Sequence, residues 1–210
     1  MIDNKLQILQ REQHWDTIFQ TADYTQVLWH QNSPEKSVEI IERHAAKGAK
    51  ILDAGCGASF LADRLLSHGY KKLTLLDTSK TSLGIIKERV NSEALEFVCS
   101  DILNFSIDQK FDIWHDRAVF HFLLNKQERI TYFKVLQASL KRGGTAIIST
   151  FRIGGPEQCA GLDIVQYNPK KMREELPNGL ELIESEEYIH ITPKESGQEY
   201  IYFTIKRKTN

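Results

Sequence analysis

The sequence alternates short apolar runs with amphipathic stretches, and this alternation constrains the fold more than any other feature. Such a pattern is typical of parallel strands joined by crossover helices. Two helix starts are well marked, at Ser33-Pro34-Glu35 and at Asn125-Lys126-Gln127-Glu128, each with an N-cap residue and an acid in the first turn. The expected parallel strands are residues 50–54, 73–76, 95–99, 111–115 and 145–151.

The C-terminal part follows a different pattern. Residues 180–191 and 199–206 are predicted as two long strands with a turn between them, forming an antiparallel hairpin at one sheet edge. We expect a single α/β domain over residues 1–210, Rossmann-like and doubly wound, with a mostly parallel seven-stranded sheet. Residues 1–33 would form an N-terminal helical extension, or lid, on a core of residues 34–210.

Composition excludes several classes of protein. With 41% hydrophobic residues the chain can bury a core, and its 27 basic and 28 acidic residues leave no positive field for nucleic acid or an anionic membrane. Its 3 cysteines are too few and too scattered for a disulfide framework or a zinc site. The N-terminus lacks the unbroken apolar run of a secretory signal. We therefore expect a cytoplasmic protein with no metal and no nucleic-acid or membrane partner.

A glycine-containing turn follows the first expected strand. Gly55 and Gly57 allow the backbone to turn sharply and to approach a ligand that a Cβ would obstruct. Open α/β sheets bind ligands at such a turn. A dinucleotide fingerprint requires a third glycine where this chain has Phe60, and there is no GK[ST] phosphate loop. The turn therefore favours a ligand other than a dinucleotide or a nucleoside triphosphate.

Acidic residues follow the second and third expected strands. Asp77 lies 20 residues after Gly57, where a carboxylate can accept hydrogen bonds from both ribose hydroxyls. Asp101 is placed to bind the amino group of an adenine while Ile102 covers the ring. Since the glycine turn carries no basic residue, these acids predict a site for a nucleoside without phosphates, such as S-adenosylmethionine (AdoMet).

Five motifs in order carry a resemblance to a known family: ILDAGCGAS at 51–59, LLD at 75–77, CSDIL at 99–103, FDIWHDRA at 111–118 and LKRGG at 140–144. They resemble the motif series of the class I AdoMet-dependent methyltransferases, and a Gly-Pro…Cys-x-Gly-Leu run at 155–162 is similar to a bacterial small-molecule-type subgroup. The resemblance implies that Asp53, Gly55 and Gly57 border the methionine moiety of AdoMet. It also implies that Asp77 binds the ribose and that Asp101 and Ile102 bind the adenine.

The fourth expected strand ends in His115-Asp116-Arg117, which the resemblance places opposite the methyl group. His115 can position the methionine tail or relay a proton, and Asp116 can accept a proton or hold a cationic acceptor. We interpret both as catalytic. Arg117 can bind an acidic substrate, but a structural ion pair with Asp116 is the alternative. His115 and His121 lack metal-ligand spacing.

Three further positions complete the predicted site. Trp29, in Trp29-His30-Gln31, resembles a Trp-Tyr-Gln signature of some family members and can cover the cofactor or pack in the core. Thr78, next to Asp77, is counted with the cofactor site. Arg152 begins an irregular segment after the fifth strand and is a candidate for substrate binding.

The leading interpretation is an AdoMet-dependent methyltransferase that methylates an oxygen, nitrogen or sulfur atom of a small molecule. A protein-lysine methyltransferase is the alternative within the family, since members with the Trp-Tyr-Gln signature include some, so a protein substrate is not excluded. An NAD(P)-dependent oxidoreductase and a non-catalytic AdoMet-binding protein are further alternatives. An Asn/Asp-Pro-Pro-Tyr element for base amines is absent, since His115-Asp116-Arg117-Ala118 stands in its place, which argues against nucleic acid.

Overall fold

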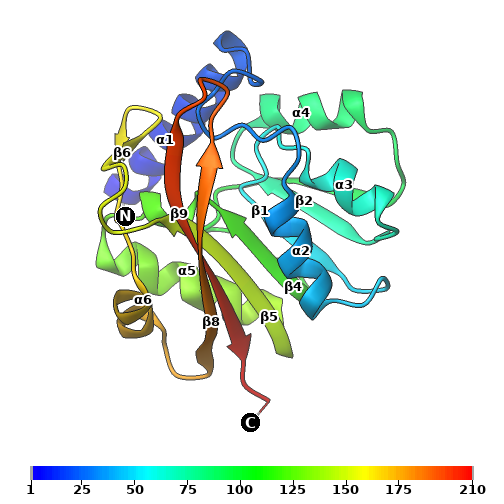
Figure 1. Cartoon of the computed structure of the whole chain (residues 1–210), viewed down its shortest axis with the longest axis vertical. Coiled ribbons are helices and arrows are strands. Elements are labelled where there is room, and N and C mark those ends of the chain that lie inside the picture. The colour runs from blue at the N-terminus through cyan, green and yellow to red at the C-terminus, as the bar shows by residue number, and fades with distance from the viewer. Residues whose placement is uncertain (1, 210) are drawn as a thin grey trace.

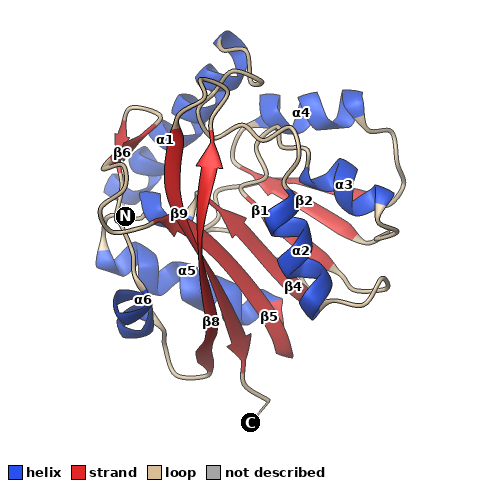
Figure 2. Ribbon diagram, in the orientation of Figure 1, coloured by secondary structure: helices blue, strands red, loops and turns tan. Residues whose placement is uncertain are grey.

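A computed structural model describes residues 2–209, with side chains from residue 9 onward. Its main sheet has seven strands in the order β3-β2-β1-β4-β5-β9-β8 (Figures 1 and 2). β9 pairs antiparallel with both neighbours, whereas β1 to β5 are parallel. The strands are β1 (Ile51–Ala54), β2 (Leu73–Asp77), β3 (Leu95–Cys99), β4 (Phe111–Arg117), β5 (Leu140–Phe151), β8 (Leu180–Ile191) and β9 (Gly197–Arg207). The predicted fold class, including the C-terminal hairpin, is confirmed.

Helices cover both faces of the sheet (Figure 1), which is why β1 and β2 are apolar along almost their whole length and fully buried. α2, α3 and α4 pack on one face around Ile41, Leu65 and Ile86, and α5 and α6 pack on the other around Leu136 and Met172. The helices are α1 (Ile2–Thr21), α2 (Glu35–His44), α3 (Leu61–Ser67), α4 (Lys80–Arg89), α5 (Lys126–Ser139) and α6 (Pro169–Glu175), with a 3₁₀ turn η1 (Phe120–Phe122).

The starts of α2 and β5, and the capping of α5, differ from the predictions. Pro34, rather than Ser33, is the N-cap of α2, and it carries no side-chain cap. Asn125 caps α5 as predicted, by accepting from the Gln127 amide, but Glu128 pairs with Arg11 instead of completing a capping box. β5 begins at Leu140, because the two glycines at 143–144 form an irregularity within the strand rather than a turn before it.

The N-terminal helix α1 packs on the end of α4. The Asp16 carboxylate accepts hydrogen bonds from the Ser79 hydroxyl at 2.8 Å and from the Thr81 amide at 2.9 Å. These bonds satisfy donors in the first turn of α4 and lower the pKa of Asp16. α1 is therefore fixed beside the carboxyl end of β2. The irregular segment after β5 contains the short pair β6 (Gln158–Cys159) and β7 (Leu162–Asp163). Among residues 2–209, no helix is long and apolar enough to cross a membrane.

Candidate active site

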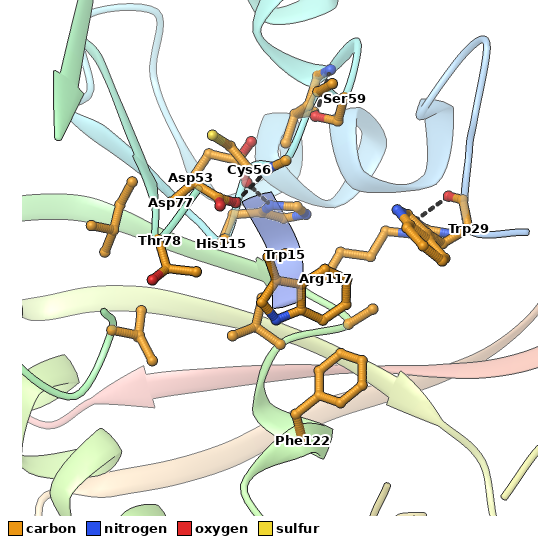
Figure 3. Close-up of a pocket in the computed structure, with 18 of the residues that line it drawn as sticks. Trp15, Trp29, Asp53, Cys56, Ser59, Asp77, Thr78, His115, Arg117 and Phe122 are labelled. Atoms are coloured by element: carbon orange, nitrogen blue, oxygen red, sulfur yellow. Dashed lines mark hydrogen bonds and ion pairs between the residues drawn. The ribbon is translucent and has the colours of Figure 1, made fainter. Parts of the chain in front are cut away.

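A pocket lies at the carboxyl ends of β1 to β4, where an open parallel sheet places its ligands (Figure 3). The glycine turn after β1 and the ends of β2 and β3 form one wall, and α1 with the segment before α2 forms another. The predicted residues that line it are Trp29, Asp53, Gly55, Gly57, Asp77, Thr78, Asp101, Ile102, His115 and Arg117. Ten sequence-predicted residues thus lie around one cavity, whereas Asp116 and Arg152 do not.

The glycine turn has a backbone that only glycine adopts easily. Gly55 and Gly57 have φ values of +71° and +53°. A Cβ on Gly55 would lie 2.1 Å from Val119 Cγ2, and one on Gly57 would lie 3.2 Å from the Phe19 ring. The amides of Gly55 and Cys56 both donate to the Leu76 carbonyl, at 2.7 and 3.0 Å, which holds the turn against β2.

Asp77 occupies the wall at the end of β2. One carboxylate oxygen accepts from the Gly57 amide and the other from the Ser79 amide, both at 2.7 Å. Burial raises the pKa of Asp77 to about 6, opposed by these backbone hydrogen bonds. The neighbouring Thr78 hydroxyl is buried with no partner among the described residues. The acid is therefore rigidly placed, with remaining lone pairs available to a ligand.

Asp101 and Ile102 follow β3 as predicted and line the same cavity. The Leu103 amide donates to Asp101 at 2.8 Å, and the Arg11 side chain of α1 pairs with the other oxygen at 3.1 Å. Arg11 also pairs with Glu128 at 2.6 Å. The carboxylate expected to receive an adenine amino group is therefore already shared with an arginine.

A buried hydrogen-bonded chain forms the floor of the pocket. His115 Nδ1 lies 2.7 Å from Asp53 Oδ1, and His115 Nε2 lies 2.9 Å from the Ser37 hydroxyl. The Ser37 hydroxyl lies 3.4 Å from the hydroxyl of Tyr202, and Asp53, Ser37 and His115 are all less than 5% exposed. Both ring nitrogens of His115 are thus engaged, so its position is fixed on two sides.

Arg117 lies two residues further along β4 and reaches toward Trp29, whose carbonyl accepts from Nη1 at 2.9 Å (Figure 3). Around it the pocket is aromatic: the Trp15 ring makes edge contacts with Trp29 and Phe122, at centroid distances of 6.0 and 5.1 Å. This part of the cavity, bordered by Trp15, Trp29, Arg117 and Phe122, is called the aromatic chamber below.

Asp116 does not occupy the position predicted for a catalytic residue. Its side chain points to the opposite face of β4, where Tyr132 donates to it at 2.6 Å and the Val119 and Phe120 amides donate at 3.0 and 3.4 Å. Burial raises its pKa to about 6. Successive strand residues face opposite ways, so His115 and Asp116 do not share a pocket. We correct the expectation: Asp116 stabilises the turn after β4, and the alternative ion pair with Arg117 does not form.

Arg152 also lies away from the cavity. Its guanidinium pairs with Glu199 at 2.7 Å and lies 3.7 Å from a Glu187 oxygen, on the C-terminal hairpin. The expected role in substrate binding does not fit this position. His121 is buried and stacks on Phe151, and burial lowers its pKa to about 3.

Four residues of the site were missed from the sequence: Arg11, Trp15, Ser37 and Phe122 line the cavity. Trp15 is one of 3 tryptophans and stands in an otherwise polar stretch, a signal that could have been used. Arg11 and Ser37 carried no such signal, because their roles depend on how α1 and α2 dock.

A family model described as a methyltransferase domain matches residues 51–144, which contain β1 to β4 and the glycine turn. The match covers the strand ends that carry Asp53, Asp77 and Asp101. Residues 51–144 are thus similar to a methyltransferase domain. The strand order, with β5 beside an antiparallel C-terminal hairpin, is the order expected from that resemblance.

Three known methyltransferases are similar to this chain. A malonyl-(acyl-carrier protein) O-methyltransferase of Priestia megaterium is 28% identical over 156 residues, 73% of this chain and 54% of that protein. The eEF1A lysine and N-terminal methyltransferase of Mus musculus is 24% identical over 152 residues, 71% of this chain and 21% of that protein. The N-methyltransferase NodS of Bradyrhizobium japonicum, solved with S-adenosylhomocysteine, has a TM-score of 0.69 at 18% identity, covering 92% of this chain and 98% of NodS. The chain spans about half the length of the curated relatives it matches first.

The residues of the pocket fit AdoMet, the cofactor that the resemblance implies. The glycine turn packs closely against Val119 and Phe19, where a Cβ would clash, three carboxylates from successive strand ends line the cavity, and the turn has no basic residue that would select a phosphate. Among the side chains described, those of residues 9–209, no cluster of three or more His, Cys, Asp or Glu is arranged to hold a metal ion.

Proposed function

We propose that the protein is an AdoMet-dependent methyltransferase that transfers a methyl group to an oxygen, nitrogen or sulfur atom of a small molecule. The observation that carries the proposal is one continuous cavity in which strand-end carboxylates around a glycine turn adjoin the aromatic chamber. The first part suits a phosphate-free nucleoside, and the second suits a mostly apolar acceptor. The match of residues 51–144 to a methyltransferase domain supports the donor, and the geometry of the chamber supports the acceptor.

The cofactor residues would act through fixed acceptors and close backbone approach. Asp77 would accept hydrogen bonds from the ribose hydroxyls, and Thr78 offers its unpartnered hydroxyl beside it. Asp101 and Ile102 would contact the adenine. Asp53, with the amides of the glycine turn, would border the methionine moiety. When bound, AdoMet supplies an electrophilic methyl group on a sulfonium.

His115 would hold Asp53 and Ser37 in place rather than act as a free base. Because both of its nitrogens already have partners, a proton leaving an acceptor reaches His115 only through the Ser37 hydroxyl. Methyl transfer needs mainly an acceptor aligned close to the methyl carbon, so positioning by rigid walls supplies most of the rate. Trp29, which the sequence assigned to the cofactor, would close the acceptor side of the cavity instead.

The geometry favours a small acceptor over a lysine side chain. Arg117 in the wall of the aromatic chamber repels an ammonium group, and Trp15 and Phe19 of α1 add apolar rings to the lining. A malonyl-(acyl-carrier protein) O-methyltransferase among the relatives supports an acceptor presented as a small acyl group. The mouse lysine methyltransferase, with 21% of its length covered, keeps a protein acceptor as the second candidate.

Calorimetry with S-adenosylhomocysteine (AdoHcy), and with NADH as the comparison ligand, tests the proposal. We expect micromolar AdoHcy binding and no NADH binding; tight NADH binding without AdoHcy binding would overturn it. Incubation with methyl-labelled AdoMet and a cell lysate then separates the acceptor classes. Label in the small-molecule fraction supports the proposal, and label in protein bands supports the lysine alternative.

A further inference from the structure

Arg117 has donors that no protein group uses. Its Nη1 donates to the Trp29 carbonyl at 2.9 Å, but its Nε and Nη2 each expose less than 1 Å² and have no hydrogen-bond partner among the described residues. A guanidinium stays charged at any pH that a folded protein tolerates. Burying two donors of a cation without hydrogen-bond partners lowers the stability of the fold. A role in binding a ligand would explain why they are kept.

The groups around this guanidinium do not neutralise it. Among the described residues no carboxylate lies within 4.0 Å of Arg117, since Asp116 faces the other side of β4. Its neighbours are phenols: the Tyr200 ring lies 4.8 Å from the guanidinium carbon, the Tyr202 hydroxyl interacts weakly with the cation outside hydrogen-bonding geometry, and Tyr188 is also close. Stacking on an aromatic ring orients the guanidinium but leaves its hydrogen-bonding edge without a partner.

Arg117 borders the aromatic chamber, with its Nε–Nη2 edge covered by neighbouring side chains. Arg117, Trp15, Trp29 and Phe122 all line the cavity, and Figure 3 shows Arg117 extending away from Asp77 and Thr78 toward Trp29. The other arginine in the cavity wall, Arg11, is already paired with Asp101 and Glu128. A ligand in the chamber therefore meets apolar rings and one unneutralised cation.

We propose that the acceptor is a small organic acid whose carboxylate displaces the side chains over the Nε–Nη2 edge of Arg117 and binds there, while its apolar body lies among Trp15, Trp29 and Phe122. This inference rests on the proposed function for the identity of the chamber as the acceptor site. Nε and Nη2 form a side-on pair of donors that matches the two oxygens of a carboxylate. A phosphate would demand further basic partners, and the described wall offers none that is unpaired.

The test measures anion preference in the chamber directly. Benzoate and hexanoate are titrated into the protein saturated with AdoHcy, each against its neutral amide, benzamide or hexanamide, by calorimetry and tryptophan fluorescence. We expect each acid to bind at least about tenfold tighter than its amide. Arg117→Met should abolish this preference. Arg117→Lys keeps the charge but lacks the side-on pair of donors, so it should retain only part of the preference. Arg173→Met, on the exposed surface of α6, should leave it unchanged.

Each other outcome overturns the inference. Equal binding of acids and amides, or binding of neither pair, means that the chamber does not select a carboxylate. If Arg117→Met weakens AdoHcy tenfold or more but leaves 5′-methylthioadenosine unaffected, Arg117 binds the carboxylate of the cofactor instead. Failure of the proposed function is distinguishable, because it appears as absent AdoHcy binding in the wild-type protein, and the acid preference is then measured without AdoHcy. Circular dichroism of both Arg117 variants confirms that they are folded.

Discussion

The two halves of the pocket satisfy their polar groups in opposite ways. In the half around the glycine turn, each carboxylate already accepts hydrogen bonds from the protein: Asp77 from two amides, Asp101 from an amide and an arginine, and Asp53 from His115. In the aromatic chamber, Arg117 has donors without acceptors. The first half is preorganised as it stands, whereas the second is complete only with a ligand.

This difference separates general from specific parts of the site. A preorganised half can bind one common cofactor with little rearrangement, and its residues come from the matched region 51–144. The chamber also draws Trp15 and Trp29 from outside that region. Changes in the first half should therefore alter cofactor affinity, and changes in the second should alter the choice of acceptor.

The largest effect is expected at Asp77. Asp77→Ala removes the proposed bonds to both ribose hydroxyls, each worth about 1.5–3 kcal/mol for a charged acceptor, so AdoHcy affinity should fall by about 100-fold or more. Calorimetry measures it, with the exposed Asp108→Ala as the control. Benzoate binding in the chamber should be retained, and normal AdoHcy binding by a folded Asp77→Ala protein would refute the ribose assignment.

A pH titration tests the contact between Asp77 and the ligand without a substitution. The carboxylate form of Asp77 accepts from hydroxyls and the protonated form does not, and the pKa of Asp77 is raised to about 6. AdoHcy affinity should therefore be constant above pH 7 and fall as the pH is lowered through 6, by at most about tenfold per pH unit. Asp77→Asn should flatten the profile. An affinity that is level between pH 5 and 8 in the wild-type protein would mean that Asp77 does not contact the ligand.

Replacing the unpaired cation should increase stability. Arg117→Met keeps an apolar side chain of similar length and removes a charge that no protein group neutralises, so the free energy of unfolding without ligand should rise by about 1 kcal/mol. Urea denaturation measures the change. Asp77→Ala should shift stability the other way, because it leaves the Gly57 and Ser79 amides unpaired. A loss of stability in Arg117→Met would show that the Trp29 and Tyr200 contacts already balance the charge.

The smallest effect is expected at Arg11. If Asp101 binds the adenine amino group, its ion pair with Arg11 competes, and Arg11→Met should raise AdoHcy affinity about threefold, or about 0.6 kcal/mol. Glu128→Gln is the matched variant and removes the other partner of Arg11. It should strengthen the Arg11–Asp101 pair and so lower AdoHcy affinity slightly. A weaker AdoHcy complex in Arg11→Met would instead assign Arg11 itself to the cofactor.

The sequence predicted the strand ends well because β1 and β2 are largely apolar runs that, like most of β4, are buried along nearly their whole length. That placed Asp53, Asp77 and Asp101 around one cavity without knowledge of any contact. The prediction for β4 was less accurate. Adjacent strand residues face opposite layers, so His115 and Asp116 could not both face the cavity, and periodicity alone does not reveal which face is open. Hydrogen bonds to Ser37 of α2 and to Tyr132 of α5 show the two directions.

The remaining misses come from long-range docking. Arg11 reaches Asp101 across 90 positions of the chain, and nothing near either residue indicates this pairing. Arg152 was placed at the acceptor site because it follows β5, but two glutamates of the hairpin hold it elsewhere. Contacts between distant segments depend on helix orientation, which local sequence patterns do not encode.

The walls of the cavity come from segments that are remote in sequence, including α1, the ends of β1 to β4 and Cys159. A molecule bound there is a non-covalent cross-link between those segments and exists only in the native state. At 100 times its dissociation constant, such a ligand adds about 2.7 kcal/mol to the free energy of unfolding. The lifetime of this protein against proteases should therefore follow the supply of its ligand.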